Sequence, residues 1–210
     1  MKNIINRFIR GSIVACSNIV TLSVVKGWKS RVNQYYTIWL RREFRALGKG
    51  AGICRPIYLE GGKYITVGEN FQCDQRLRLD AIDRYKENRF CPEIIIGDNV
   101  TIQKDCHIGA IQKLSIGNGV LIASKVYISD HSHGEFNSEN LQLPPERRSL
   151  SSKGPVTIEN NVWIGEGVVV LPGVTIGENS IVGANAVVTK SIPKNSLAVG
   201  NPAVVIKIIN

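Results

Sequence analysis

The feature that most constrains the fold of this chain is an isoleucine or valine at every sixth position over two long stretches. Isoleucine and valine together make up less than a quarter of the 210 residues, so chance does not produce twelve consecutive matches. A fixed short period is typical of a chain built from stacked repeats. With one two-residue shift and one gap, the period runs through Ile96, Ile102, Ile108, Ile116, Ile122, Ile128, Ile158, Ile164, Val170, Ile176, Val182 and Val188.

A period of six fits neither the 3.6-residue repeat of an α-helix nor the two-residue repeat of a simple strand. It fits short strands wound around a triangular prism, with one repeat for each face and the branched residue pointing inward. The position two residues earlier must then be small and inward-facing, and it holds Val100, Cys106, Val120, Val126, Val162, Val168, Val174, Ser180 and Ala186. Glycines directly after the repeat residues predict corners with unusual backbone angles, at Gly97, Gly109, Gly117, Gly165, Gly177 and Gly183.

Four short motifs add a family resemblance to this periodicity. They are Val162-Trp163-Ile164-Gly165, the run from Leu171 to Gly177, Val188-Thr189-Lys190, and Gly200-Asn201-Pro202-Ala203. With them the chain resembles the hexapeptide-repeat acyltransferases, in particular sugar O-acetyltransferases of the maltose/galactoside and O-antigen, capsule or exopolysaccharide type. The resemblance covers roughly residues 60–209 and implies an all-β, left-handed parallel β-helix. The handedness comes from the resemblance alone, because parallel crossovers are in general right-handed.

The chain divides into three parts in this interpretation. Residues 1–50 form a basic helical segment, residues 51–192 form the catalytic β-helix with a loop insertion at 129–155, and residues 193–210 form a tail. The insertion leaves and rejoins the repeat in register, which makes it a natural place for a functional site.

The net positive charge is confined to the N-terminal segment. Residues 1–50 carry ten Lys and Arg against the single Glu43, whereas the rest of the chain is balanced at 16 basic and 16 acidic residues. The apolar run at 13–25 is too short and too polar for a bilayer span, which needs about 20 apolar residues, and no small-residue cleavage site follows it as a signal peptide requires. An amphipathic helix over 31–47 predicts either a cap on the open end of the solenoid or a segment on an anionic membrane surface.

The five cysteines do not form a disulfide framework. Their number is odd and no CxxC spacing occurs, which favours a reducing compartment. Cys106 falls in the small inward slot and is expected to be a buried, inert thiol. We therefore expect a cytoplasmic protein, either free or peripheral on the inner face of the cytoplasmic membrane, with no nucleic-acid partner.

Two of the three histidines, His131 and His133, stand at the start of the insertion. Moving an acyl group from a thioester to a hydroxyl needs a base for the hydroxyl proton, and neutral imidazole suits that role. In the resembling sugar acetyltransferases the catalytic histidine follows the last repeat residue before the loop by five positions, which implies His133 as the base. His131 is the alternative, or it positions the acceptor. His107 is expected to be a surface residue.

The resemblance also implies acetyl-CoA as co-substrate, bound in a groove between the subunits of a homotrimer. The residues that match its cofactor-binding positions are Trp163, Ala184, Thr189, Lys190 and Lys207. A lysine ammonium suits contact with phosphate. For Trp163, packing against a neighbouring subunit is the other reading, and Val204 departs from relatives that carry a basic residue there.

Three acidic residues are the acceptor-side candidates. Asp74 matches an acceptor-binding position of the sugar acetyltransferases, and a carboxylate accepts two hydrogen bonds from a diol. Asp130 and Glu135 flank the histidines, where a carboxylate contacts the acceptor or fixes an imidazole tautomer. A metal site like that of γ-class carbonic anhydrases is not expected, because paired ligands there lie five residues apart and His131 and His133 lie two apart.

The sequence therefore predicts an acetyl-CoA-dependent O-acetyltransferase that acts on a sugar, in bacterial surface polysaccharide synthesis, without a required metal. An N-acetyltransferase acting on an amino-sugar or an antibiotic stays open within the enzymes. A metal-holding or structural β-helix scaffold is the alternative from another class.

Overall fold

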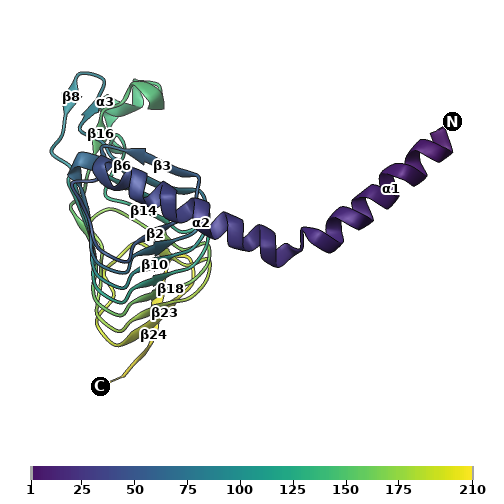
Figure 1. The fold of residues 1–210 in the computed structure, drawn as a ribbon. Coiled ribbons are helices and arrows are strands. Elements are labelled where there is room, and N and C mark those ends of the chain that lie inside the picture. Colours follow the sequence, from purple (N-terminus) through teal and green to yellow (C-terminus); the bar gives the residue numbers. More distant parts are fainter. Residues whose placement is uncertain (1, 210) are drawn as a thin grey trace.

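A three-sided stack of parallel strands forms the body of the protein. The computed structural model describes residues 2–209, and three sheets run along the stack (Figure 1). Sheet A contains β1 (Ala46–Leu47), β4 (Ile65–Val67), β9 (Glu93–Ile96), β12 (Lys113–Ile116), β17 (Val156–Ile158) and β20 (Thr175–Ile176). Sheet B contains β2 (Gly52–Ile53), β5 (Gln72–Cys73), β10 (Thr101–Ile102), β13 (Leu121–Ile122), β18 (Trp163–Ile164), β21 (Ile181–Val182), β23 (Ser196–Val199) and β24 (Val204–Ile208). Sheet C contains β3 (Ile57–Glu60), β6 (Leu77–Ala81), β11 (His107–Ala110), β14 (Tyr127–Ser129), β19 (Val169–Val170) and β22 (Val187–Val188).

The repeat residues form three buried columns, one for each sheet. In sheet C, for example, Ile108 pairs with Ile128, which pairs with Val170, which pairs with Val188. All twelve repeat residues are at most 2% exposed, and so are the nine small residues that precede them. The predicted prism and its inward positions are therefore confirmed. Burying this much branched apolar surface coil by coil is the main source of stability in a solenoid.

The Cys106 thiol has the buried character that the repeat predicted for it. Cys106 is 1% exposed, and burial raises the pKa of its thiol to about 11. Burial likewise raises the pKa of the Cys73 thiol, and the thiolate is the reactive form. Both are packing residues of the core.

The corner glycines have a different physical basis from the predicted one. Positive φ angles occur three residues after the repeat residue, at Asn70, Asn99, Asp105, Gly119, Lys125, Asn161, Gly167, Gly173, Asn179 and Asn185. Apart from Gly109, the glycines directly after the repeat residue are instead required by close approach of the next coil. A Cβ on Gly117 would lie 2.8 Å from the backbone N of Asn160, and one on Gly165 would lie 2.6 Å from that of Ala184.

Two helices precede the solenoid, and the second one covers its open end. α1 spans Lys2–Ile19 and α2 spans Leu22–Leu40, followed by the 3₁₀ turn η1 (Arg41–Glu43). The Thr37 hydroxyl accepts the backbone N–H of Ile53 at 2.9 Å, and the Arg41 guanidinium donates to the carbonyl of Leu47 at 2.8 Å. These contacts satisfy backbone groups at the sheet edge that would otherwise be open to pairing. The capping role predicted for the N-terminal segment thus belongs to the second half of α2.

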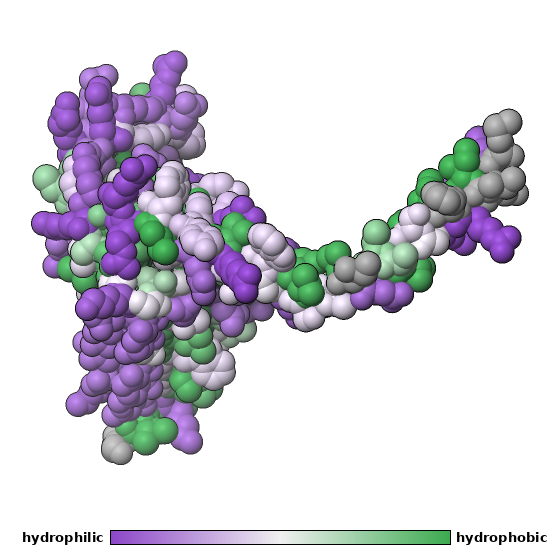
Figure 2. Space-filling model, in the orientation of Figure 1, coloured by the Kyte–Doolittle hydropathy of each residue, from purple (hydrophilic) through white to green (hydrophobic). Residues whose placement is uncertain are grey.

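The first helix, α1, extends away from the solenoid (Figure 1). Its described side chains are exposed, apolar and basic ones alike (Figure 2). Within residues 2–209 no single helix has the length and apolar character of a membrane span. Only two helices taken together reach the length and apolar character of a span, Ile5–Asn18 and Leu22–Glu43, and this pair is bent by 65°.

The edge between sheets C and A carries two long excursions. The first is a hairpin of β7 (Arg84–Tyr85) and β8 (Asn88–Arg89), preceded one coil earlier by the turn η2 (Gly62–Tyr64). The second runs between β14 and β17 and contains β15 (Ser132–His133), α3 (Ser138–Leu141), η3 (Pro145–Arg147) and β16 (Leu150–Ser151). The two meet where the Tyr85 hydroxyl donates to the Glu146 carbonyl at 3.0 Å and the Asn88 amide to the Ser149 hydroxyl at 2.8 Å.

The ends of the β-helix lie outside the boundaries expected from sequence. β1 at 46–47 already pairs with β4, so the first coil begins before residue 51. At the other end Ile192 bridges to Ile176, and β23 continues sheet B. Only β24 turns back, antiparallel to β23. The tail is therefore part of the fold.

Candidate functional site

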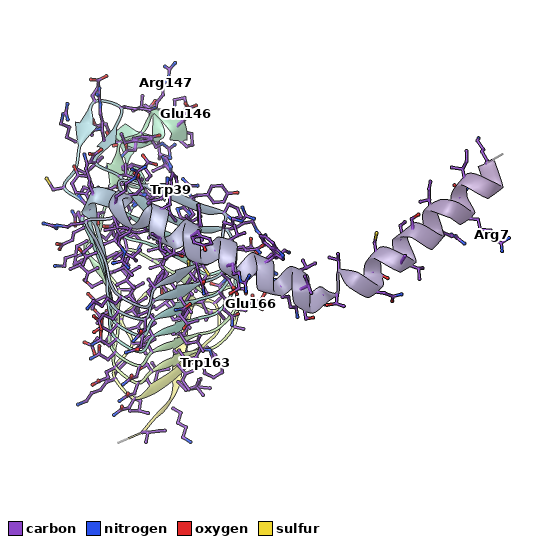
Figure 3. All side chains as sticks on the ribbon, in the orientation of Figure 1. Arg7, Trp39, Glu146, Arg147, Trp163 and Glu166 are labelled. Carbon is purple, nitrogen blue, oxygen red and sulfur yellow. The ribbon has the colours of Figure 1, made fainter. Side chains whose placement is uncertain are left out.

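A pocket of about 390 Å³ lies between the two excursions and the outer face of sheet C. His131 and His133 contribute from the insertion, Tyr85 from the hairpin, and Asp80, His107 and Tyr127 from sheet C. Its sheet C lining comes from β3, β6, β11 and β14, so the pocket lies toward the N-terminal end of that sheet, where Glu146 and Arg147 of the insertion also stand in Figure 3. It is the cavity that contains both histidines of the insertion.

Sheet C gives the pocket its floor through two outward-facing rows. One row aligns Arg78, His107 and Tyr127 on successive strands, and the other aligns Asp80, Gly109 and Ser129. Gly109 leaves a gap in the second row. A Cβ there would lie 3.3 Å from Cε1 of His131 and 3.5 Å from Nε2 of His107, so two imidazole rings border the space that a side chain would take.

The His131 ring is fixed by its neighbours. Its Nδ1 lies 3.0 Å from Oδ1 of Asp130 and 3.1 Å from the Ser129 hydroxyl, and its side chain is 12% exposed. The Ser129 hydroxyl donates to the His131 carbonyl, and a carboxylate only accepts. Nδ1 must therefore carry the hydrogen, which leaves Nε2 of the neutral ring as the acceptor, a tautomer suited to proton abstraction.

Asp130 is itself held by the backbone. Its carboxylate accepts N–H bonds from Ile111 at 2.9 Å, Gln112 at 2.8 Å and Lys113 at 2.9 Å, and the residue is 0% exposed. The prediction that Asp130 contacts the acceptor is wrong, because every face of the carboxylate is enclosed by protein. The other prediction made for it, that it orients an imidazole, agrees with this geometry.

His133 is held less firmly. It lies on the short β15–β16 ladder, exposed, with its ring against the edge of Tyr85 at 5.5 Å between centroids. Its Nδ1 is 3.5 Å from the Tyr85 hydroxyl, at the limit of a hydrogen bond. Within residues 2–209 no carboxylate pairs with this ring.

The acceptor-side candidates do not gather in the pocket. Glu135 is exposed farther along the insertion, and Asp74 follows β5 on the edge between sheets B and C. Neither lines the pocket. The described residues also contain no group of three His, Cys, Asp or Glu side chains arranged to hold a metal ion.

The residues predicted to bind the cofactor are spread over sheet B and two edges of the solenoid. Trp163 projects outward from β18 and is 48% exposed (Figure 3). Ala184 follows β21 on the edge between sheets B and C, Thr189 and Lys190 follow β22 on the edge between C and A, and Lys207 lies on β24. All of them are exposed, and one protomer does not bring them into a common pocket.

Sequence reasoning missed Asp80 and Tyr85 and read His107 as a plain surface residue. His107 is instead part of the pocket, with its Nε2 3.0 Å from Oδ2 of Asp80. Asp80 and Tyr85 fall in 51–95, where the six-residue register is irregular, so no spacing pointed to them. The T-shaped contact of His107 with Tyr127, 20 residues later in the next coil, follows from strand pairing.

Comparisons with known proteins agree with this fold and indicate its family. The family model described as bacterial transferase hexapeptide (six repeats) matches residues 155–190. The WbbJ protein of Escherichia coli K12, named for O-acetyl transfer in lipopolysaccharide biosynthesis, is 43% identical over 159 residues, which are 74% of this chain and 77% of that protein. The galactoside O-acetyltransferase of the same organism is 35% identical over 176 residues, 81% of this chain and 67% of the relative.

Solved structures give the same result. A galactoside acetyltransferase in complex with coenzyme A superposes with a TM-score of 0.54 at 34% identity, covering 83% of this chain and 70% of that one. The N-acyltransferase AntD from Bacillus cereus reaches a TM-score of 0.68 at 20% identity, covering 83% and 89%, which shows the shared fold alone. The protein belongs to the hexapeptide-repeat acetyltransferases.

Proposed function

We propose that this protein transfers an acetyl group from acetyl-CoA to a hydroxyl of a saccharide during bacterial surface polysaccharide synthesis. The observation that carries the proposal is the His131–Asp130 pair beside an open pocket, in a chain whose relatives are named O-acetyltransferases. The coenzyme A complex of a 34% identical structure supports acetyl-CoA as the donor. The proposal extends to a left-handed sense of the solenoid, which the family resemblance implies.

His131 is the base in this mechanism. Nε2 of His131 takes the proton of the acceptor hydroxyl while the hydroxyl oxygen attacks the thioester carbonyl carbon. The tetrahedral intermediate then collapses, the C–S bond breaks, and the departing thiolate takes that proton from the imidazolium. The enclosed Asp130 carboxylate holds the tautomer and stabilises the transient positive charge. His133, implied by the family pattern, is the rival base.

The test of the function is mass spectrometry of a saccharide panel incubated with the protein and acetyl-CoA. A mass gain of one acetyl group, lost on mild alkali, identifies an ester on a hydroxyl. An alkali-stable product would indicate N-acetylation, and no acetylated saccharide together with no coenzyme A release would overturn the proposal.

A homotrimer completes the donor site in this proposal. Outward side chains Leu121, Trp163 and Ile181 form an apolar row along sheet B, each more than a third exposed. Such a row is unfavourable in water unless another surface covers it. A neighbouring copy packed there would cover the row and place its own surface beside Trp163. A monomeric mass in sedimentation equilibrium would contradict the trimer.

The N-terminal helix α1 is proposed to lie on the inner face of the cytoplasmic membrane. Ile5, Ile9 and Ile13 share one face at four-residue spacing, Arg7 and Arg10 lie on the other, and the chain has no acidic residue before Glu43. Arg7 points into solvent, clear of the solenoid (Figure 3). This amphipathic and basic pattern is typical of helices that bind anionic lipid surfaces.

We expect the double variant Ile9→Ser/Ile13→Ser to bind anionic vesicles at least about tenfold more weakly, because burying each isoleucine contributes about 2 kcal/mol. Co-sedimentation with phosphatidylglycerol vesicles measures the effect. The variant Asn18→Ser lies on the opposite face of the helix from Ile9 and is the control, which should bind as the wild type does. If the Ile9→Ser/Ile13→Ser variant and the control bind the vesicles equally well, the proposed membrane role of α1 is wrong.

A further inference from the structure

The pocket contains a second imidazole–carboxylate pair that the proposed reaction does not use. Nε2 of His107 lies 3.0 Å from Oδ2 of Asp80, and the same oxygen lies 2.5 Å from Nε of Arg78. The Asp80 side chain is only 5% exposed, whereas that of His107 is 32% exposed. A buried carboxylate thus anchors an imidazole that stays open to the pocket.

The orientation of this imidazole is set on two sides. The Asp80 carboxylate accepts from Nε2–H, so Nδ1 of the neutral ring is an acceptor. The Tyr127 ring lies against it edge to face, with centroids 5.2 Å apart and planes at 77°. Across the described part of the chain, no hydrogen bond engages Nδ1 of His107. A ring held this way binds a ligand at little cost in side-chain entropy.

The location of this pair relates it to the proposed base. His107 lies on β11 and His131 follows β14, the next strand of sheet C, and Nε2 of His107 and Cε1 of His131 both lie within 3.5 Å of the place that a Cβ of Gly109 would occupy. Both imidazoles line the same pocket, and each has one ring nitrogen with no hydrogen bond to a described residue, Nδ1 of His107 and Nε2 of His131. A sugar presents neighbouring hydroxyl groups, and each hydroxyl can donate one hydrogen bond.

We propose that His107, positioned by Asp80, forms an acceptor subsite that binds a saccharide hydroxyl adjacent to the one acetylated at His131. The proposal rests on the proposed function and deepens it, because it defines the acceptor as a diol. His131 receives the reacting hydroxyl, and Nδ1 of His107 accepts a hydrogen bond from the neighbouring one. The role of His107 is binding, and that of Asp80 is positioning.

The test is steady-state kinetics of the full chain with the best acceptor of the mass-spectrometric screen, starting from methyl β-galactoside as the first probe. His107→Ala should raise the KM for the saccharide about tenfold, the effect expected for one lost hydrogen bond to a preorganised group. It should leave the KM for acetyl-CoA unchanged. His107→Gln, which keeps a polar acceptor, should recover part of the loss.

Monodeoxy analogues of the acceptor give a readout that a merely structural role would not move. The wild type should discriminate about tenfold in kcat/KM against the analogue that lacks the adjacent hydroxyl. His107→Ala should lose that discrimination, whereas Glu93→Gln, which removes an exposed ion pair with Lys113 on sheet A, should keep it.

The possible results distinguish a failure of the subsite from a failure of the proposed function. If the wild type acetylates no saccharide in the screen, the proposed function fails and the subsite fails with it. If the wild type acetylates a saccharide but His107→Ala keeps both the acceptor KM and the discrimination between analogues, the subsite alone is wrong. If both KM values rise together with a loss of melting temperature, His107 is structural and the subsite is likewise overturned.

Discussion

Replacing His131 with alanine should lower kcat for acetyl transfer by at least about a hundredfold, the contribution expected of a general base. The KM for acetyl-CoA should change little, because no step of donor binding depends on that ring. The expectation follows from the enclosed Asp130 carboxylate, 3.0 Å from Nδ1, which leaves Nε2 ready to take a proton. Release of coenzyme A, followed with a thiol reagent, measures the rate.

His133→Ala is the matched variant for this prediction. The two histidines are two residues apart on the same insertion, so both variants remove the same ring from the same loop. We expect His133→Ala to retain more than a tenth of the activity, because its ring has only a long contact with Tyr85. The reverse result, with the large loss at His133, would transfer the role of base to that residue, as the family pattern implies.

The Asp130→Asn variant tests whether the carboxylate orients the His131 ring or only fills the space behind it. The amide has nearly the shape of the carboxylate, but its NH₂ group cannot accept, so some of the bonds from Ile111, Gln112, Lys113 and His131 must be lost. A fall in kcat with intact acetyl-CoA binding would show that the carboxylate acts through His131.

The fold was predictable from the sequence because its information is periodic. Ile158 and Ile176 are neighbours in sheet A, as are Ile164 and Val182 in sheet B, because the last coils repeat every 18 residues, so counting residues there is equivalent to stacking them. The same reasoning failed where coils have irregular length. Asp80 and Tyr85 lie in such coils, and their approach to the histidines depends on the path of two excursions that no period describes.

The sequence also indicated the corner glycines correctly, but the reason inferred for them was wrong. The glycines after the repeat residues looked like positions of unusual φ, yet the left-handed angles fall two residues later, mainly on asparagine and glycine. The need for glycine at the first position comes from the neighbouring coil. A contact between coils cannot be read from the sequence of one coil. The same limit applies to Asp130, whose carboxylate accepts hydrogen bonds from backbone amides of the preceding coil.

The second large effect should be on stability. Gly117→Ala should destabilise the fold by about 3 kcal/mol, because the added Cβ would lie 2.6 Å from Oδ1 of Asn160 and 2.8 Å from the adjoining backbone. Relief requires the coils to separate, yet the Gly117 N–H donates to the Ile158 carbonyl at 2.7 Å and the Asn118 N–H to Asn160 at 2.8 Å. Overpacking and weakened hydrogen bonds therefore add. A fall in melting temperature of about 9 °C is expected for a chain of this size.

Gly27→Ala provides the control with the identical chemical change. Gly27 lies within α2, and an added Cβ there meets nothing within 4 Å. Alanine favours the helix by up to about 1 kcal/mol over glycine, so this variant should melt at or slightly above the wild-type temperature. The two variants must be compared at equal protomer concentration, because assembly raises apparent stability by mass action. Equal melting temperatures for both would mean that neighbouring coils separate at little cost. Close stacking of the coils would then not explain how the strands of sheet C, which form the floor of the pocket, hold the two imidazoles in place.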